Sequence, residues 1–233
     1  MPVKYPDARN WGAVKKSADG VRWSAYPNGD KSNGGASLPF STNFPATENP
    51  ISQSGIWTNG AADGLDWHNI QTGGGLAYAT AQPTPGHFDD NVACLSGITF
   101  NANHYAQATI HLAGGYSSGH EVELYVRMNI SAHSVTGYEF YQGNGNQVAI
   151  VRWNGALDDF TVIATANHSP TDGDVMRLEA SGSTITAYIN GSQVMQVTDT
   201  TWATGHAGMG FNPWDTVVTL NAFAFSAYSA GNL

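Results

Sequence analysis

Apolar and polar residues alternate along much of the chain, and this alternation predicts β-strands. Segment 121–130 places an apolar residue at every second position, and segment 105–112 repeats the pattern over a shorter length. A period of two turns one set of side chains toward a core and the other toward solvent. We therefore expect one long strand to bury Val122, Leu124, Val126, Met128 and Ile130.

Turn signals separate these segments. Asn-Gly dipeptides occur at positions 144–145, 154–155 and 190–191. Both residue types accept the positive φ angles of tight hairpin turns, so consecutive strands should pair antiparallel. No long window shows the apolar period of a capped helix. Roughly a dozen strands on one core predict an all-β fold of two packed sheets.

Segments 121–141, 147–163 and 172–211 carry a spaced set of motifs. They contain Gly-Tyr, Arg-Trp and Gly-Asp pairs, then Leu-x-x-x-Gly-x-x-Ile-x-x-x-x-Asn-Gly, and finally Gly-Met-Gly-Phe. With these motifs, residues 38–228 resemble the concanavalin A-like lectin/glucanase superfamily, and within it the laminin-G-like jelly rolls of secreted bacterial and phage proteins. The resemblance implies a two-sheet antiparallel jelly-roll sandwich. It selects no function, because the superfamily includes lectins, hydrolases, lyases and adhesion modules.

Basic residues concentrate at the beginning of the chain. Six of the nine Lys and Arg residues lie within positions 1–31, whereas the rest has three Arg against 15 Asp and Glu residues. We divide the chain into a basic N-terminal arm or linker at 1–35 and a jelly-roll domain at 36–233. The acidic body should repel phosphate backbones, so nucleic acid is not an expected partner. No apolar run reaches the length of a membrane span, and the oligomeric state stays open.

The single cysteine and the N-terminal residues give indications of the cellular location of the protein. Cys94 is the sole cysteine, so no intramolecular disulfide or cysteine-based metal cage can form. Its apolar neighbours predict a small buried side chain rather than a reactive thiol. Residues 1–6 lack an apolar signal core. We expect an extracellular or virion-associated protein, which leaves the cell after removal of a signal or in a phage particle.

Counting residues across the hairpins predicts which side chains share a sheet face. A connection at 131–135 places Arg127 opposite Glu139, and Tyr125 then faces Tyr141. The polar face predicted in this way contains Tyr125, Arg127, Glu139, Tyr141 and Arg152. If the strand at 105–112 is a neighbour, Gln107, His111, Glu121 and Glu123 extend this face. The predicted core face contains Val126, Met128, Tyr138, Phe140, Val151 and Trp153.

Aromatic rings, carboxylates and Arg on one face suit a polysaccharide or oligosaccharide ligand. Rings cover the apolar side of a sugar, and charged groups form directed hydrogen bonds with its hydroxyls. We predict a glycan-binding module with the contact residues Gln107, Tyr125, Arg127, Glu139, Tyr141 and Arg152. Arg127→Ala should then weaken binding and leave the fold intact. The alternative is a solvated sheet face on which Arg127 and Glu139 form a cross-strand ion pair.

An enzyme is the second hypothesis. The resemblance implies that a retaining hydrolase would carry Glu-x-Asp-x-x-Glu on one strand; here Glu121 and Glu123 are acidic, but Val126 occupies the third position. A jelly-roll lyase acting on an acidic polysaccharide would use Tyr and His, with Arg or Gln beside a uronate. The catalytic candidates are therefore Tyr125, His111, Glu123 and Glu139. A structural virion or adhesion protein is the third hypothesis, suggested by the basic arm.

Calcium is the one cofactor that the sequence suggests. Loops 87–91 and 171–174 are rich in oxygen ligands, although the same residue types are ordinary in turns. The candidate ligands are Asp89, Asp90, Asp172 and Asp174. The eight His residues show no metal-binding spacing. Near predicted strand ends, one or two of Trp57, Trp67, Trp202 and Trp214 can serve as stacking platforms for a ligand.

Overall fold

The computed structural model describes residues 38–233 except 65, 115–118, 144 and 215–218. The predicted basic arm at 1–35 lies outside the described residues, so its boundary with the body remains a prediction. Within the described part, no helix has the length and apolarity needed to cross a membrane.

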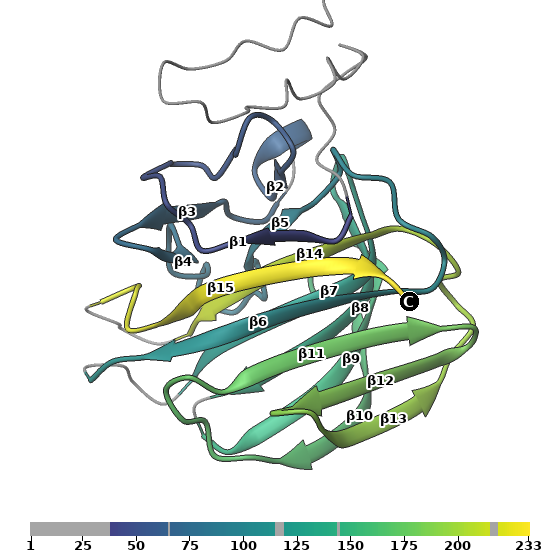
Figure 1. The fold of residues 1–233 in the computed structure, drawn as a ribbon. Coiled ribbons are helices and arrows are strands. Elements are labelled where there is room, and N and C mark those ends of the chain that lie inside the picture. Colours follow the sequence, from purple (N-terminus) through teal and green to yellow (C-terminus); the bar gives the residue numbers. More distant parts are fainter. Residues whose placement is uncertain (1–37, 65, 115–118, 144, 215–218) are drawn as a thin grey trace, which may run out of the picture. The chain divides into compact units, whose positions relative to one another are not determined.

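The described residues form two antiparallel sheets, and Figure 1 shows the eight-stranded sheet in front of the seven-stranded one. In the described part, the eight-stranded sheet has the order β13 (Ser192–Thr198), β12 (Thr184–Ile189), β11 (Val175–Ser181), β6 (His104–Leu112), β15 (Phe223–Asn232), β4 (Leu76–Ala79) and β3 (Ile70–Gly73), and β1 (Phe40–Thr42) pairs with β15. The seven-stranded sheet has the order β10 (Phe160–Asn167), β9 (Gln147–Gly155), β8 (Ser134–Gly143), β7 (His120–Ser131), β14 (His206–Pro213), β5 (Asn91–Cys94) and β2 (Thr58–Asn59). A short 3-10 turn spans Ala62–Gly64. The predicted all-β antiparallel sandwich is confirmed.

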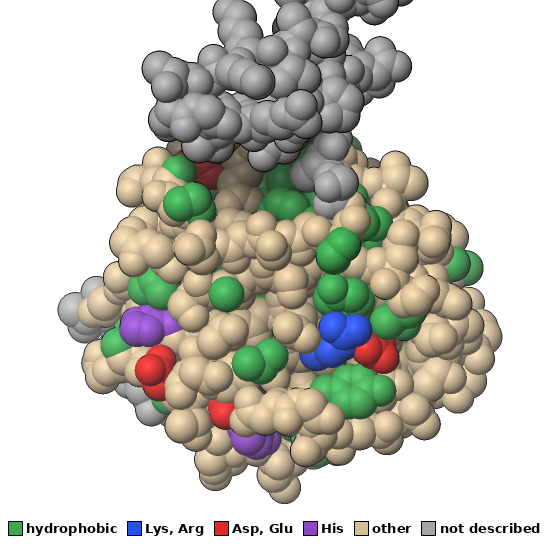
Figure 2. Space-filling model, viewed as in Figure 1, with side chains coloured by type: hydrophobic (Ala, Val, Ile, Leu, Met, Phe, Trp, Pro, Cys, Tyr) green, Lys and Arg blue, Asp and Glu red, His purple; other side chains and the backbone are tan. Residues whose placement is uncertain are grey.

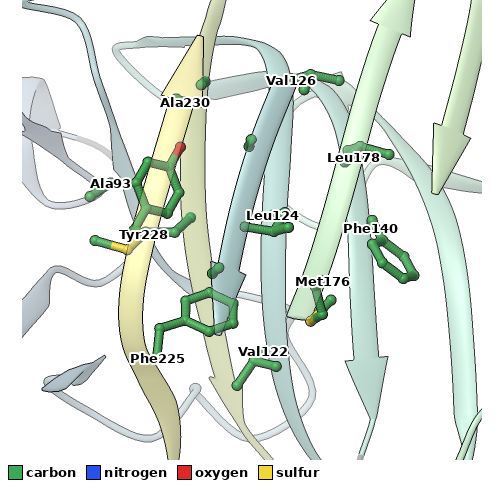
Figure 3. Close-up of a cluster of buried hydrophobic side chains, with 14 of the residues drawn as sticks. Ala93, Val122, Leu124, Val126, Phe140, Met176, Leu178, Phe225, Tyr228 and Ala230 are labelled. Atoms are coloured by element: carbon green, nitrogen blue, oxygen red, sulfur yellow. The ribbon is translucent and has the colours of Figure 1, made fainter. Parts of the chain in front are cut away.

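Apolar side chains of the two sheets meet between them (Figure 3). Val122, Leu124 and Val126 point inward from β7, as the alternation predicts, toward Met176 and Leu178 of β11. All five side chains are shielded from solvent. Burying an apolar side chain of this size stabilises the fold by about 1.5–3 kcal/mol.

The prediction also placed Met128 and Ile130 in this core, which is wrong. Both pack in a second apolar cluster, on the outer face of the seven-stranded sheet. The alternation of β7 changes sides because its pairing with β8 shifts register between Val126 and Asn129. Such a β-bulge inserts an extra residue into one strand and redirects the side chains that follow it.

Arg127 lies at the bulge with a φ of 53°, which is uncommon for a residue with a side chain. Its backbone N–H donates a hydrogen bond to Nε2 of His104, at 3.0 Å. Glycine is required at position 205, because a Cβ atom there would collide with the backbone of Arg127. The bulge therefore depends on His104 and Gly205, two residues that are distant from it in sequence.

The bulge makes Arg127 a buried structural residue, with only 2% of its surface exposed. Its guanidinium donates hydrogen bonds to the backbone oxygen of Ala102 at 3.1 and 3.0 Å, and to those of Trp202 at 2.9 Å and Gly182 at 2.7 Å. Glu139 is not among these acceptors, so the predicted cross-strand pair of Arg127 and Glu139 is wrong. The guanidinium instead joins three chain segments.

Cys94 is buried within the second apolar cluster, as its apolar neighbours predict. Burial raises the pKa of its thiol far above the ordinary value. We expect the native protein not to react with a thiol reagent such as Ellman's reagent, because the thiolate is the reacting form. The unfolded protein should release one equivalent of the chromophore. A rapid reaction of the native protein would contradict this prediction.

Candidate functional site: an acidic pocket with an aromatic rim

A pocket of about 190 Å³, which we call the acidic pocket, opens on the outer face of the seven-stranded sheet. Outward side chains of β7, β8 and β9 form its floor, and β10, β14 and the segment before β5 form its walls. Its lining consists of Phe88, Asp90, Glu121, Glu139, Tyr141, Val151, Trp153, Phe160, Val162 and Asn212.

The register of β7 and β8 brings the floor residues together. Tyr125 lies opposite Glu139, and Glu123 lies opposite Tyr141. The structure thus places Tyr125, Glu139 and Tyr141 on one face, as predicted, although Tyr125 was expected to face Tyr141. On the neighbouring strand β14, a Cβ atom at Gly210 would collide with the carboxylate of Glu123. Because Gly210 has no side chain, the carboxylate of Glu123 fits in the space beside it.

Three carboxylates converge beneath the pocket and form what we call the acidic cluster: Asp90, Glu123 and Glu139. One oxygen of each lies within 4.8 Å of the others. The hydroxyl of Tyr125 is 2.9 Å from Oε2 of Glu123 and 3.2 Å from Oε2 of Glu139. The indole N–H of Trp153 also donates to Oε2 of Glu139, at 2.5 Å. The hydroxyl of Tyr125 can donate its hydrogen bond to either glutamate, so it bridges the two side chains.

The environment of these carboxyl groups favours their protonated forms. Burial raises the pKa of Glu139 to about 7, even though its two hydrogen bonds act in the opposite direction. Burial and the nearby charge of Glu139 raise the pKa of Glu121 to about 8. The pKa values of Asp90 and Glu123 are raised well above the ordinary range, first by burial and then by their acidic neighbours. Without a positive partner, the site therefore holds protons near neutral pH.

Aromatic side chains form the rim of the pocket. Phe88 and Trp214 are 38% and 36% exposed and stack with ring centroids 5.2 Å apart at an angle of 19°. Phe160 meets the edge of Phe88 at 5.0 Å and lies 5.3 Å from Trp153. In the described part of the chain, three of the four exposed large hydrophobic side chains are Phe88, Trp214 and Val162. Exposed apolar groups gathered at one pocket indicate a ligand surface.

Asp158, in the connection between β9 and β10, fixes the position of the rim. Its carboxylate accepts the backbone N–H of Phe88 at 2.7 Å and lies 2.7 Å from Nδ1 of His87. This hydrogen bond raises the pKa of His87 above its ordinary value. The loop that presents Phe88 is thus joined to the strand pair that presents Phe160.

Several residues predicted for the polar face lie elsewhere. Arg127 is turned away by the bulge. Arg152 lies opposite Tyr138, whose side chain is in the inter-sheet core, and binds Asp199 at 2.7 Å. Val151 and Trp153, which were expected in that core, occupy the outer face instead. The predicted positions of Arg152, Val151 and Trp153 are therefore wrong by one residue of register.

Gln107 and His111 belong to β6, in the other sheet, where β6 pairs with β11 and β15. Gln107 lines a shallow depression of about 360 Å³ on the outer face of the eight-stranded sheet, the face seen in Figure 2. Arg177 lies beside it, 3.7 Å above the ring of Tyr105 and in contact with Glu179. The expected extension of the polar face by Gln107 and His111 is wrong. Because Tyr125 and His111 lie on different sheets, they do not form the acid–base pair of a lyase.

Of the four calcium candidates, only Asp90 enters the acidic cluster. Asp89 accepts the backbone N–H of Thr84 at 2.7 Å, and Asp172 accepts that of Leu112 at 2.8 Å. Asp174 accepts hydrogen bonds from three residues: His168, Thr171 and Asn190. These contacts are the ones expected of turn residues. Of the four Trp candidates, Trp214 is exposed at a rim, whereas Trp57 and Trp67 are buried and Trp202 is half-buried.

The sequence matches no protein-family model and no curated protein at a significant level. Solved structures do share the architecture. The carbohydrate-binding module CBM66 from Bacillus subtilis has 14% identity and a TM-score of 0.53, over 78% of this chain and 96% of that one. The fold is the concanavalin A-like jelly roll. The jelly-roll fold that the resemblance implied is thus confirmed.

Two further structures illustrate how differently this jelly roll is used. The β-glucanase of Bacillus licheniformis has 10% identity and a TM-score of 0.52, over 84% of this chain and 98% of that one. The CBM2 module of the evolved Dit protein of Lactobacillus casei BL23 phage J-1 has 9% identity and a TM-score of 0.51, over 82% of this chain and 93% of that one. Likeness at these identities establishes the fold, so function must be argued from the pocket.

Proposed function

We propose that the chain is a glycan-binding module whose ligand enters the acidic pocket. The observation that carries this proposal is the exposed stacked pair of Phe88 and Trp214 beside the carboxylates of Asp90 and Glu139. Aromatic rings cover the apolar face of a sugar, while carboxylates accept hydrogen bonds from its hydroxyls. Jelly-roll neighbours described as carbohydrate-binding modules support the same reading. An extracellular or virion-associated location belongs to this proposal.

The charge of the pocket favours a neutral glycan. Its lining contains Asp90, Glu121 and Glu139 and no Lys or Arg. The arginines that were expected to bind a ligand, Arg127 and Arg152, are engaged elsewhere by carbonyl groups and by Asp199. A uronate or sulfate would find no cationic side chain in this lining to compensate for its charge. The hydroxyl groups of a neutral sugar need no cationic partner, and they can donate hydrogen bonds to the carboxyl oxygens of the lining.

Trp214→Ala and Phe88→Ala should each weaken binding of a neutral polysaccharide by about tenfold or more, because truncating a ligand-contacting aromatic anchor costs over about 1.4 kcal/mol. The fold should persist, since both rings are partly exposed. Affinity electrophoresis through gels containing a neutral β-glucan, galactan or fructan, with pectate for comparison, measures the effect.

Tyr188→Ala is the matched control. Tyr188 lies opposite Arg177 on the eight-stranded sheet and is half-buried there. Its truncation should leave binding unchanged. Retarded migration in pectate only, or equal losses for Tyr188→Ala and Trp214→Ala, would contradict the proposed pocket.

A retaining glycoside hydrolase is the second candidate function, on one specific observation. Asp90 and Glu139 both line the pocket with carboxylate oxygens within 4.8 Å of each other. The pair is therefore at least as close as the two carboxyl groups of retaining enzymes, about 5–5.5 Å apart, and closer than those of inverting enzymes, about 6.5–9.5 Å apart. The acidic position that β7 lacks at Val126 is thus supplied from β8. This function would be favoured if the wild type released reducing ends from a neutral polysaccharide and Glu139→Gln did not. If the wild type releases none, glycan binding without hydrolysis is the remaining function.

A further inference from the structure

The acidic cluster has more hydrogen-bond acceptors than donors. Its three carboxylates are at most 4% exposed. Among the described side chains, the hydroxyl of Tyr125 and the indole of Trp153 donate to them. Buried like charges at this separation repel one another unless protons or a cation compensate for them. Within residues 38–233, no Lys or Arg side chain does so: Arg127, Arg152 and Arg177 have other partners, and this range contains no further Arg or Lys.

Asn212 gives a second, independent indication of a ligand. This neutral side chain is only 2% exposed and lines the same pocket as Asp90 and Glu139. Its Oδ1 atom is buried without a hydrogen-bond partner, as are Oδ1 of Asp90 and Oε1 of Glu123. Buried polar atoms are rarely left unpaired. All three of these atoms are oxygen acceptors, which a cation satisfies and an anion does not.

The geometry suits a calcium-sized ion. Calcium binds six to eight oxygens at about 2.3–2.6 Å, so ligand atoms on opposite sides of it are about 5 Å apart. The cluster oxygens lie within 4.8 Å of one another. Magnesium holds its ligands at about 2.0–2.1 Å in a near-ideal octahedron and usually keeps several waters, so a buried set of side-chain oxygens suits it less well than calcium. A set made only of carboxylate and amide oxygens favours hard cations over zinc or copper.

We propose that Asp90, Glu123 and Glu139, with the amide oxygen of Asn212, bind one calcium-sized divalent cation at the floor of the acidic pocket. The loop residues Asp172 and Asp174 are outside this site. The proposal goes beyond glycan binding and does not depend on it, since all four named ligands belong to the chain itself.

The test uses the full chain, freed of metal with a chelator, then dialysed and titrated with calcium chloride at constant ionic strength. At a calcium concentration about a hundred times Kd, the melting temperature should rise by about 5–10 °C, and titration calorimetry should give one equivalent. Magnesium should give a smaller shift. Terbium should show luminescence sensitised through tryptophan, because the indole of Trp153 contacts Glu139.

Glu123→Gln is the decisive variant. It keeps the size of the side chain and relieves repulsion, so the metal-free protein should fold, with a melting temperature equal to or above that of the metal-free wild type. Its affinity for calcium should fall by at least about a hundredfold, because a charged ligand is lost. Asp172→Asn, outside the site, should bind calcium like the wild type. No calcium response in the wild type, an undiminished response in Glu123→Gln or a lost response in Asp172→Asn would each overturn the proposal.

Discussion

Arg127→Met should lower the free energy of unfolding by about 3–5 kcal/mol, because it removes a guanidinium on which three chain segments depend. The backbone oxygens of Ala102, Gly182 and Trp202 would lose their charged donor. A hydrogen bond to a charged group contributes about 1.5–3 kcal/mol, and the guanidinium donates four of them. Urea unfolding followed by tryptophan fluorescence measures the difference.

Arg177→Met is the control for this substitution. Arg177 lies on the outer face of the eight-stranded sheet, against Glu179 and the ring of Tyr105. A partly exposed ion pair contributes about 0–1 kcal/mol, so this variant should remain close to the wild type. If the two variants differ by less than 1 kcal/mol, the structural role assigned to Arg127 is incorrect. Such a result would return Arg127 to the solvated face that the sequence pattern predicted.

The alternation of residues predicted much of the sheet architecture and part of the pocket floor. The structure pairs Tyr125 with Glu139, whereas the prediction paired Tyr125 with Tyr141, so the two registers differ by two residues. A shift of two preserves which side chains point outward, whereas a shift of one reverses them. The prediction therefore kept these three residues together although it paired them incorrectly.

The β8–β9 hairpin shows the effect of a shift of one. A two-residue Asn-Gly turn would pair Gln142 with Gln147, but the structure pairs Gln142 with Val148. This single residue moves Arg152 off the outer face and brings Val151 and Trp153 onto it. The longer connection includes Asn146 with a φ of 77°. Asn-Gly also occurs in longer turns, so the dipeptide alone does not fix the register.

Contacts between distant segments account for the remaining differences. The bulge at Arg127 relies on His104 and Gly205, and Phe88 is held by Asp158 from a loop about 70 residues later. No local period encodes such contacts. One signal was available in the sequence: Gly208 and Gly210 lie two residues apart on β14, and side chains there would collide with Met128 and Glu123. Two glycines at a spacing of two leave one face of β14 without side chains, and this leaves room for the side chains of the neighbouring strand β7, including the carboxylate of Glu123.

His104 should make the protein sensitive to mild acid. Its Nε2 accepts the backbone N–H of Arg127, and its Nδ1 lies 2.7 Å from the backbone oxygen of Asn101, so the folded state requires the neutral imidazole. Burial lowers the pKa of His104 from 6.5 to about 4. The unfolded chain takes up the proton first as the pH falls, so this contribution to stability is present above pH 6.5 and is lost progressively toward pH 4.

The loss amounts to about 3 kcal/mol, from the difference between the two pKa values. The carboxyls of Glu139 and Glu121 act in the opposite direction: their raised pKa values cost stability as the pH rises from 4.5 toward 7 and 8. The contribution of His104 must therefore be measured as the difference in unfolding free energy between the wild type and a variant without the titrating imidazole. In His104→Gln, the amide can accept from Arg127 and donate to Asn101 without titrating. Urea unfolding of both proteins in chelator, between pH 4 and 7, should show the wild type losing about 3 kcal/mol relative to His104→Gln as the pH falls. Parallel pH profiles would mean that neutral His104 does not stabilise the bulge at Arg127. In that case His104 would also not stabilise the register that places Tyr125 opposite Glu139.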